Sequence, residues 1–125
     1  MTYEITAPPS LEATVALPSS KSISNRALII HALTGGAVQP SNLSDCDDTA
    51  VMRAALGLMP PVIDIKAAGT AMRFLTAYLA VTPGEHVLTG TERMLHRPIG
   101  ILVDALRSLG AQIDYEGEEG FPPLR

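Results

Sequence analysis

The chain has 125 residues, of which 46% are hydrophobic and 18% are charged, so it can bury a core and its composition excludes a disordered chain. No apolar run reaches the length of a membrane span, and a formal net charge of −4 argues against a general nucleic-acid surface. The first residues lack the basic flank and apolar core of a signal peptide, and the single cysteine, Cys46, fits a reducing compartment. We therefore expect a cytoplasmic protein that binds neither nucleic acid nor a membrane.

The first predicted elements are two short strands, residues 4–7 and 13–17, which Pro8-Pro9-Ser10 separates. A helix follows over residues 22–33, because apolar residues recur on one side of it and two glycines, Gly35-Gly36, can end it. These features predict two strands that lead into an amphipathic helix.

The middle of the chain predicts a strand over residues 38–43 and a second helix over residues 45–58. Aspartates lie at the positive end of that helix, so its start already carries negative charge and is a poor place for an anion. A strand over 62–65 then leads into a third helix over residues 70–80. Apolar residues cover this third helix nearly all round, so we expect it to be central and buried.

The last third predicts a strand at residues 86–88, a fourth helix that begins at Pro98, and a strand over residues 111–115. Gly110 stands where a helix of this length would end. Because strands and helices alternate along the chain, the sequence favours an α/β (α+β) fold that is built from repeated units.

The helix that begins near Ser22 has a start rich in anion-binding groups. Serine hydroxyls and backbone N–H groups can donate to a phosphate or carboxylate, and Lys21 adds a mobile positive charge. Arg26 lies one turn after Ser22, so both project from one face of the helix. The alternative is ordinary serine capping beside a solvated lysine and arginine, and composition alone does not distinguish the two interpretations.

Two further helix starts carry related chemistry. Gly69 allows a ligand to approach the backbone closely, and Arg97 stands just before the start of the fourth helix. Close packing of small residues and a surface arginine are the respective alternatives. Arg73, in the apolar third helix, is expected to pair with a buried carboxylate. The three histidines have no ligand-like spacing with Cys46, so the sequence predicts no metal site.

Three sequence segments together resemble one family. Residues 17–28, LPSSKSISNRAL, resemble the N-terminal signature of the EPSP synthases, which are 3-phosphoshikimate 1-carboxyvinyltransferases. Residues 68–73, AGTAMR, resemble the second signature of that family. Residues 88–94, LTGTERM, and residues 97–106, RPIGILVDAL, resemble the third. The order of the segments matches the family, and the resemblance covers essentially the whole chain.

The resemblance implies transfer of the enolpyruvyl group from phosphoenolpyruvate to the 5-hydroxyl of shikimate 3-phosphate, without a metal or organic cofactor. It implies that Lys21 contacts both substrates and is catalytic, and that Ser22 and Arg26 bind shikimate 3-phosphate. Gly69 and Arg97 would bind phosphoenolpyruvate. The implied fold consists of repeated βαβαββ units, of which this chain would be a partial N-terminal domain.

Two residues and the length depart from the family pattern. Ala67 stands where the family often has asparagine, and Phe74 stands where it often has proline. Because the family is several times longer and has its active site between two domains, we expect a fragment that is inactive alone. Residues 1–17 would pair with the missing second domain, and residues 18–125 would be the first part of the N-terminal domain. The alternatives are a non-catalytic anion-binding module and a purely structural domain with capped helix starts.

Overall fold

The computed structural model describes residues 2–37 and 39–125, which form five helices and one two-stranded parallel sheet. In chain order the elements are α1 (Lys21–Leu33), α2 (Asp47–Leu58), β1 (Val62–Asp64), α3 (Gly69–Leu79), β2 (Val87–Thr89), α4 (Glu92–Leu95) and α5 (Gly100–Ser108). The mixed α/β class predicted from the sequence is therefore confirmed.

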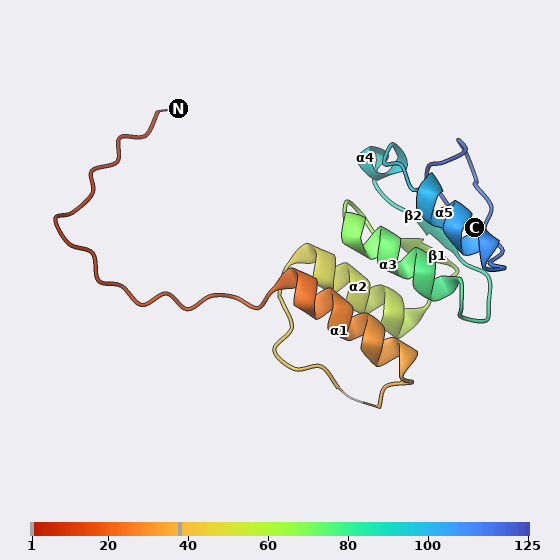
Figure 1. The fold of residues 1–125 in the computed structure, drawn as a ribbon, viewed down its shortest axis with the longest axis horizontal. Helices are drawn as coiled ribbons and strands as arrows, with labels where there is room; N and C mark the ends of the chain where they lie inside the picture. The colour runs from red at the N-terminus through yellow and green to blue at the C-terminus, as the bar shows by residue number, and fades with distance from the viewer. Residues whose placement is uncertain (1, 38) are drawn as a thin grey trace.

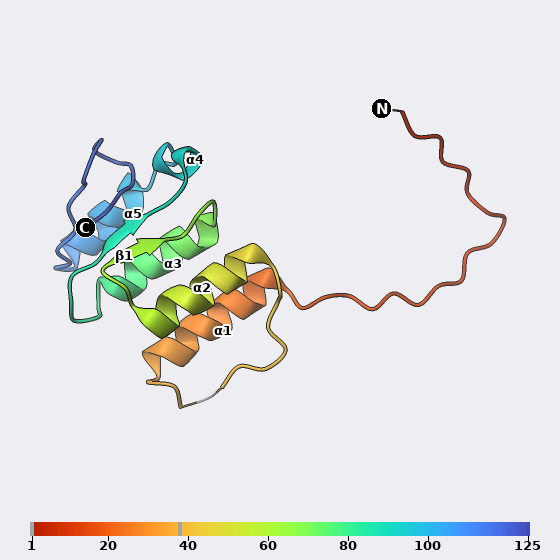
Figure 2. The same cartoon turned by 180° about the vertical axis from the view of Figure 1, so that it is seen from behind.

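Three helices lie side by side, with α2 against α1 and α3 next to both, as Figures 1 and 2 show from opposite sides. Helix α3 also packs on β2 and α5, so it stands at the centre of the molecule, as its apolar sequence predicts. Each of these elements contributes buried apolar side chains to the core, which includes Leu28, Met52, Ile63, Ile65, Met72, Leu75, Leu88 and Val103.

Strands β1 and β2 are parallel neighbours, and Ile63 is paired with Leu88 in the register. Parallel strands need a long connection, and here α3 supplies it. Beyond the named strands, Leu124 forms antiparallel bridges with Leu88 and with Tyr115. Because β1 and β2 run in the same direction, the loop into α3 and the loop into α4 leave the sheet at the same end.

The two strands predicted before α1 are absent, because residues 2–20 contain no strand. Figure 1 shows this segment as an extended chain that leads away from the helices. Its large apolar side chains are exposed, and those of Ile5, Leu11 and Leu17 each have more than four fifths of their surface accessible. A strand is stable only when a neighbour pairs with its backbone groups, and the described residues of this chain place no strand beside it.

Several boundaries also differ from prediction. The strand predicted over residues 38–43 is not formed at residues 39–43, and Val38 lies outside the described residues. Residues 111–115 form only the single bridge at Tyr115. Helix α5 begins at Gly100 and not at Pro98, with Ile99 as its N-cap, and the four-residue helix α4 precedes it. The helix end at Gly110 is confirmed, since that glycine has a φ of 98° directly after the C-cap.

Candidate anion-binding site

A cleft of about 510 Å³ lies where the starts of α1, α2 and α3 meet the segment after α4. Four of its lining side chains are basic and one is a carboxylate. The full lining is Lys21, Arg26, Asp48, Ala67, Gly69, Thr70, Arg73, Phe74 and Arg97. Such an excess of cations around one cavity attracts small anions rather than cations or apolar molecules.

The parallel sheet explains why Gly69 and Arg97 are neighbours although 27 residues separate them. The loops after β1 and β2 are joined by a hydrogen bond from the Thr91 N–H to the Lys66 carbonyl oxygen at 3.0 Å. Gly90 lets these loops approach, because a Cβ at that position would lie 2.5 Å from the same carbonyl oxygen. The start of α3 and the segment that carries Arg97 are thereby held side by side.

The start of α3 is uncapped and faces two arginines. Its N-cap is Ala68, which makes no side-chain hydrogen bond to the first turn, so the first N–H groups have no side-chain acceptor. A Cβ at Gly69 would overlap Nη1 of Arg97, so the guanidinium lies directly against the glycine. Backbone N–H groups, a helix dipole and a guanidinium therefore converge at one position, an arrangement suited to a phosphate or carboxylate.

Arg73 does not pair with a buried carboxylate, contrary to the sequence-based expectation. Its side chain is exposed, and its Nη1 donates to the Gly69 carbonyl oxygen at 3.1 Å. Among residues 2–37 and 39–125, no carboxylate forms an ion pair with Arg73 or Arg97. Both arginines therefore add positive charge to the cleft that no neighbouring acid neutralises.

Lys21 enters the cleft from the first residue of α1, which Ser20 caps by accepting from the Ile23 N–H at 3.4 Å. Its Nζ lies 3.3 Å from Oδ2 of Asp48, in the first turn of α2. The two side chains remain partly exposed, at 48% for the lysine and 24% for the aspartate. An ion pair this accessible is weak, so an incoming anion can compete for the lysine.

Buried polar contacts fix the first turns of α1 and α2 relative to each other. The Thr49 hydroxyl donates to Oδ1 of Asn25 at 2.9 Å, and the Ser44 N–H donates to the hydroxyl oxygen of Ser24 at 2.8 Å. Hydrogen bonding with Ser44 and Thr49 also lowers the pKa of the Cys46 thiol. These bonds hold Lys21 and its partner carboxylate at adjacent helix starts.

Arg26 and Ser22 have different positions with respect to the cleft. Arg26 lines it, and its Nη1 donates to the Ser22 carbonyl oxygen at 3.0 Å. Ser22 is exposed, and its side chain is not part of the lining. Of the five residues predicted to bind substrates, the structure thus gathers four around one cavity and leaves the Ser22 side chain outside the lining.

Five lining residues were not predicted to bind a substrate: Asp48, Ala67, Thr70, Arg73 and Phe74. The aspartates of α2 predict a helix start that is poor for anions, but no pattern in the sequence indicates that one of them, Asp48, pairs with Lys21. Arg73 lies one turn after Gly69 on α3, so its position at the cleft could have been inferred once the glycine was placed in the site.

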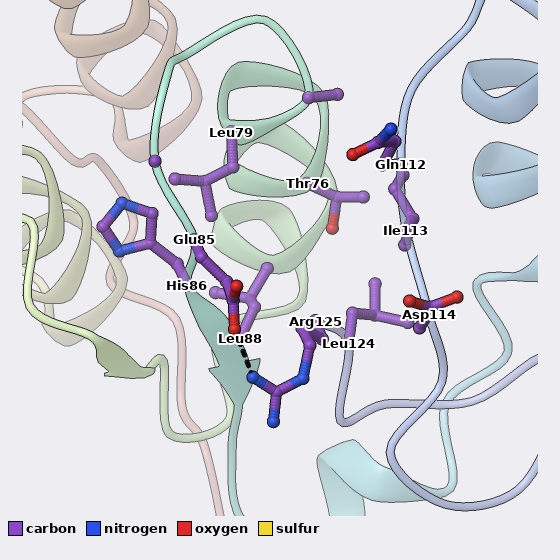
Figure 3. A pocket seen from close by; sticks show the side chains of 12 residues that line it. Thr76, Leu79, Glu85, His86, Leu88, Gln112, Ile113, Asp114, Leu124 and Arg125 are labelled. Carbon is purple, nitrogen blue, oxygen red and sulfur yellow. Dashed lines mark hydrogen bonds and ion pairs between the residues drawn. The ribbon is translucent and has the colours of Figure 1, made fainter.

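A second cavity, of about 210 Å³, lies between the end of α3, the start of β2 and the last residues of the chain (Figure 3). It contains one arginine, Arg125, whose Nη1 and Nε lie 2.5 Å and 2.6 Å from carboxylate oxygens of Glu85 and Glu116. Hydrogen bonds to Glu116 and Glu85 raise the pKa of Arg125. Asp114 and Gln112 complete a polar rim, so this cavity has no unpaired cation for an anion.

In the described part of the chain no helix is both long and apolar enough to cross a membrane. Residues 2–37 and 39–125 also contain no group of three or more His, Cys, Asp or Glu side chains placed to hold a metal ion.

A family model and two relatives that match this chain carry the same enzyme name. The family model for EPSP synthase (3-phosphoshikimate 1-carboxyvinyltransferase) matches residues 5–60 and 57–125. A 3-phosphoshikimate 1-carboxyvinyltransferase of Bacteroides fragilis is 68% identical over all 125 residues, which cover 30% of that relative. One from Burkholderia vietnamiensis is 48% identical over 93% of this chain and 32% of the relative.

A solved structure agrees with these matches at the level of the fold. EPSP synthase from Acinetobacter baumannii superposes with a TM-score of 0.73 over 88% of this chain and 31% of that chain, at 24% identity. The present chain therefore spans about 30% of the length of the curated relatives it matches. With a family match over nearly its whole length and the fold of a solved family member, this chain belongs to the EPSP synthase family.

Proposed function

We propose that this chain supplies the first part of an enzyme that transfers the enolpyruvyl group of phosphoenolpyruvate to the 5-hydroxyl of shikimate 3-phosphate, releasing phosphate. This is a step of the shikimate pathway to the aromatic amino acids. The observation that carries the proposal is the cleft in which four basic side chains surround the uncapped start of α3. Both substrates carry a phosphate and a carboxylate, so a cleft with this charge is chemically matched to them.

Different residues of the cleft would bind the two substrates. Gly69 and Arg97 are proposed to hold phosphoenolpyruvate, because N–H groups and a guanidinium meet there. Arg26 and Ser22 are proposed to bind shikimate 3-phosphate at the start of α1. Lys21 would contact both substrates and act in catalysis, once an anion has drawn it away from Asp48.

The contribution of these residues to the rate would be electrostatic and positional. Two anions repel each other, and lysine and arginine neutralise this repulsion while they hold the reacting atoms in contact. In the proposed transfer, the 5-hydroxyl gives up its proton as its oxygen bonds to the enol carbon of phosphoenolpyruvate, and the methylene carbon takes up a proton. The methylene carbon then loses a proton as the bond from the enol carbon to the phosphate oxygen breaks, which restores the double bond and releases phosphate. Cations at the phosphate would stabilise the charge that develops as it leaves.

We also propose that the active enzyme needs a second domain, which would close the cleft from the other side. The 30% coverage of the curated relatives and the exposed apolar side chains of residues 2–17 support this view. Residues 1–17 would pair with strands of that domain, and residues 18–125 would form the first part of the N-terminal domain. Alone, the chain would bind its ligands weakly, without turnover. We assign the reaction to the cytoplasm, where the single thiol would stay reduced.

A chimera tests the proposal. The first 30% of the Bacteroides fragilis relative would be replaced by this chain, which aligns with it over all 125 residues. Phosphate release would then be measured with both substrates. We expect turnover within about tenfold of the parent, a difference of about 1.4 kcal/mol in transition-state stabilisation.

The matched control is the same chimera with Lys21→Ala, which should fold and lose most of the turnover. A folded chimera that binds both substrates without turnover, beside an active parent, would instead favour a non-catalytic anion-binding module. A folded chimera that binds neither substrate would favour the purely structural alternative.

A further inference from the structure

Phe74 lies directly beneath the guanidinium of Arg26. The Cζ atom of Arg26 is 5.7 Å from the centre of the Phe74 ring, and both side chains line the cleft. The two residues come from different helices, α1 and α3, so the contact is made by the tertiary structure and not by local spacing. This distance falls within the range in which the face of an aromatic ring attracts a cation.

The contact constrains a side chain that makes one hydrogen bond to the residues described in the structure. Arg26 is exposed, and its hydrogen bond to the Ser22 carbonyl oxygen uses Nη1 alone. An arginine side chain has many rotamers, and it loses conformational entropy when a ligand fixes it in one of them. A ring that holds the guanidinium plane in the cleft before the ligand arrives reduces the share of this cost that falls on binding.

The position of Phe74 is fixed by helix α3 and by the core. Phe74 lies one turn after Thr70 on α3, so both residues are on the face that borders the cavity. The ring is half-buried and packs against the core, which fixes its position under Arg26. Contacts with the core therefore hold the Phe74 ring in place, and its exposed face is available to the Arg26 guanidinium.

We propose that Phe74 is a positioning residue for Arg26 and thereby sets the affinity of the cleft for the phosphorylated ligand that Arg26 holds. The identity of that ligand, shikimate 3-phosphate, rests on the proposed function. The ring acts through the Arg26 guanidinium, and other groups bind the anion at Gly69 and Arg97. Its effect is therefore specific to one of the two anions.

The first experiment needs no ligand. Proton and nitrogen NMR signals of the Arg26 side chain should be shifted upfield by the ring in the unaltered chain. Phe74→Leu keeps an apolar side chain of similar size without the ring and should return these signals to ordinary positions. Phe74→Tyr keeps the ring face and should leave them shifted. Arg26 signals that are the same in all three proteins would overturn the proposal, whatever the chain binds.

The second experiment measures the dissociation constants of shikimate 3-phosphate and phosphoenolpyruvate by calorimetry. Phe74→Leu should weaken the first ligand about twofold to fivefold, the range of an exposed cation–π contact, and leave the second unchanged. Phe74→Tyr should restore the affinity. In an Arg26→Ala background, Phe74→Leu should have no further effect, because the residue it positions is gone.

These outcomes separate the inference from the proposed function. An unaltered, folded chain that binds neither substrate would contradict the proposed function, and the NMR signals would still decide whether Phe74 positions Arg26. An unaltered chain that binds shikimate 3-phosphate, with the same loss from Phe74→Leu in both backgrounds, would overturn the inference alone. Helical circular dichroism of each variant would confirm that the fold is retained.

Discussion

The cleft at the helix starts and the pocket near Arg125 both contain arginine, yet only the cleft is suited to an anion. In the pocket near the end of the chain, Arg125 is held by Glu85 and Glu116, and Asp114 adds further negative charge. In the cleft at the helix starts, four cations share the lining with one carboxylate, Asp48. The difference shows that an anion site is defined by cations that lack acidic partners, and not by basic residues as such.

The backbone reinforces this contrast. The cleft lies at the uncapped N-terminus of α3, where N–H groups are available, whereas the other pocket borders the opposite end of the same helix. The dipole of one central helix therefore favours anions at the first cavity and disfavours them at the second.

Removal of an unpaired cation should have the largest effect. Arg97→Ala removes the guanidinium that lies against Gly69, and it should weaken phosphoenolpyruvate binding about tenfold to a hundredfold, the value of a hydrogen bond to a charged group. Calorimetry with both substrates checks this. Shikimate 3-phosphate should be affected much less, and an equal loss for both anions would contradict the assignment of Arg97 to one of them.

A methyl group at Gly69 should have the next largest effect. It would occupy the space of the Arg97 guanidinium, a flexible end that can move, so Gly69→Ala should fold and weaken phosphoenolpyruvate binding about tenfold. Gly57→Ala in α2 is the matched control, since a Cβ there meets nothing within 4 Å. The control should leave binding unchanged and raise the thermal midpoint, because alanine favours a helix. Unaltered binding in the Gly69 variant would be inconsistent with a ligand at this helix start.

Neutralising Asp48, the carboxylate of the cleft lining, should strengthen anion binding. Asp48→Asn removes the acid that pairs with Lys21, so inorganic phosphate should bind about twofold to fivefold more tightly, the range of an exposed ion pair. Asp47→Asn removes the same charge from the same helix turn, outside the cavity lining, and should change binding less. Weaker binding in the Asp48 variant would mean that this carboxylate holds Lys21 in its working position.

The smallest effect should come from the other cavity. Arg125→Ala breaks two accessible ion pairs, so it should lower the thermal midpoint slightly and leave the binding of both substrates unchanged. A thermal scan and calorimetry of the same sample check both parts. Loss of anion binding in this variant would remove the contrast between the two cavities.

The elements that could be predicted from the sequence are those with a local signal. Apolar residues, together with the charges, prolines and glycines at helix ends, predicted four of the five described helices, and Gly110 marked the end of the last one. The four-residue helix α4 is too short to show a period. The strands predicted at residues 4–7 and 13–17 were wrong for this structure, because a strand depends on a partner that its own residues do not specify.

The candidate site was predictable residue by residue but not as an arrangement. Lys21, Gly69 and Arg97 each stand beside a predicted helix start, and resemblance to a family gave them roles. Their convergence depends on the parallel pairing of β1 with β2, which no local pattern encodes. The exposed position of Arg73 was missed for a similar reason, since its helix is apolar in sequence but borders the cleft on one side.

We infer that anions bind at the start of α3 because its first N–H groups have no side-chain acceptor, and because Arg73 and Arg97 have no acidic partner among the described residues. An amide NMR titration of the unaltered chain with phosphoenolpyruvate tests it most directly. We expect the largest chemical-shift changes at the amides of Gly69, Thr70 and Arg97, and no change at the amides of residues 112–114 and Arg125. Largest shifts around Arg125, or a folded chain with no shift at Gly69, would contradict it.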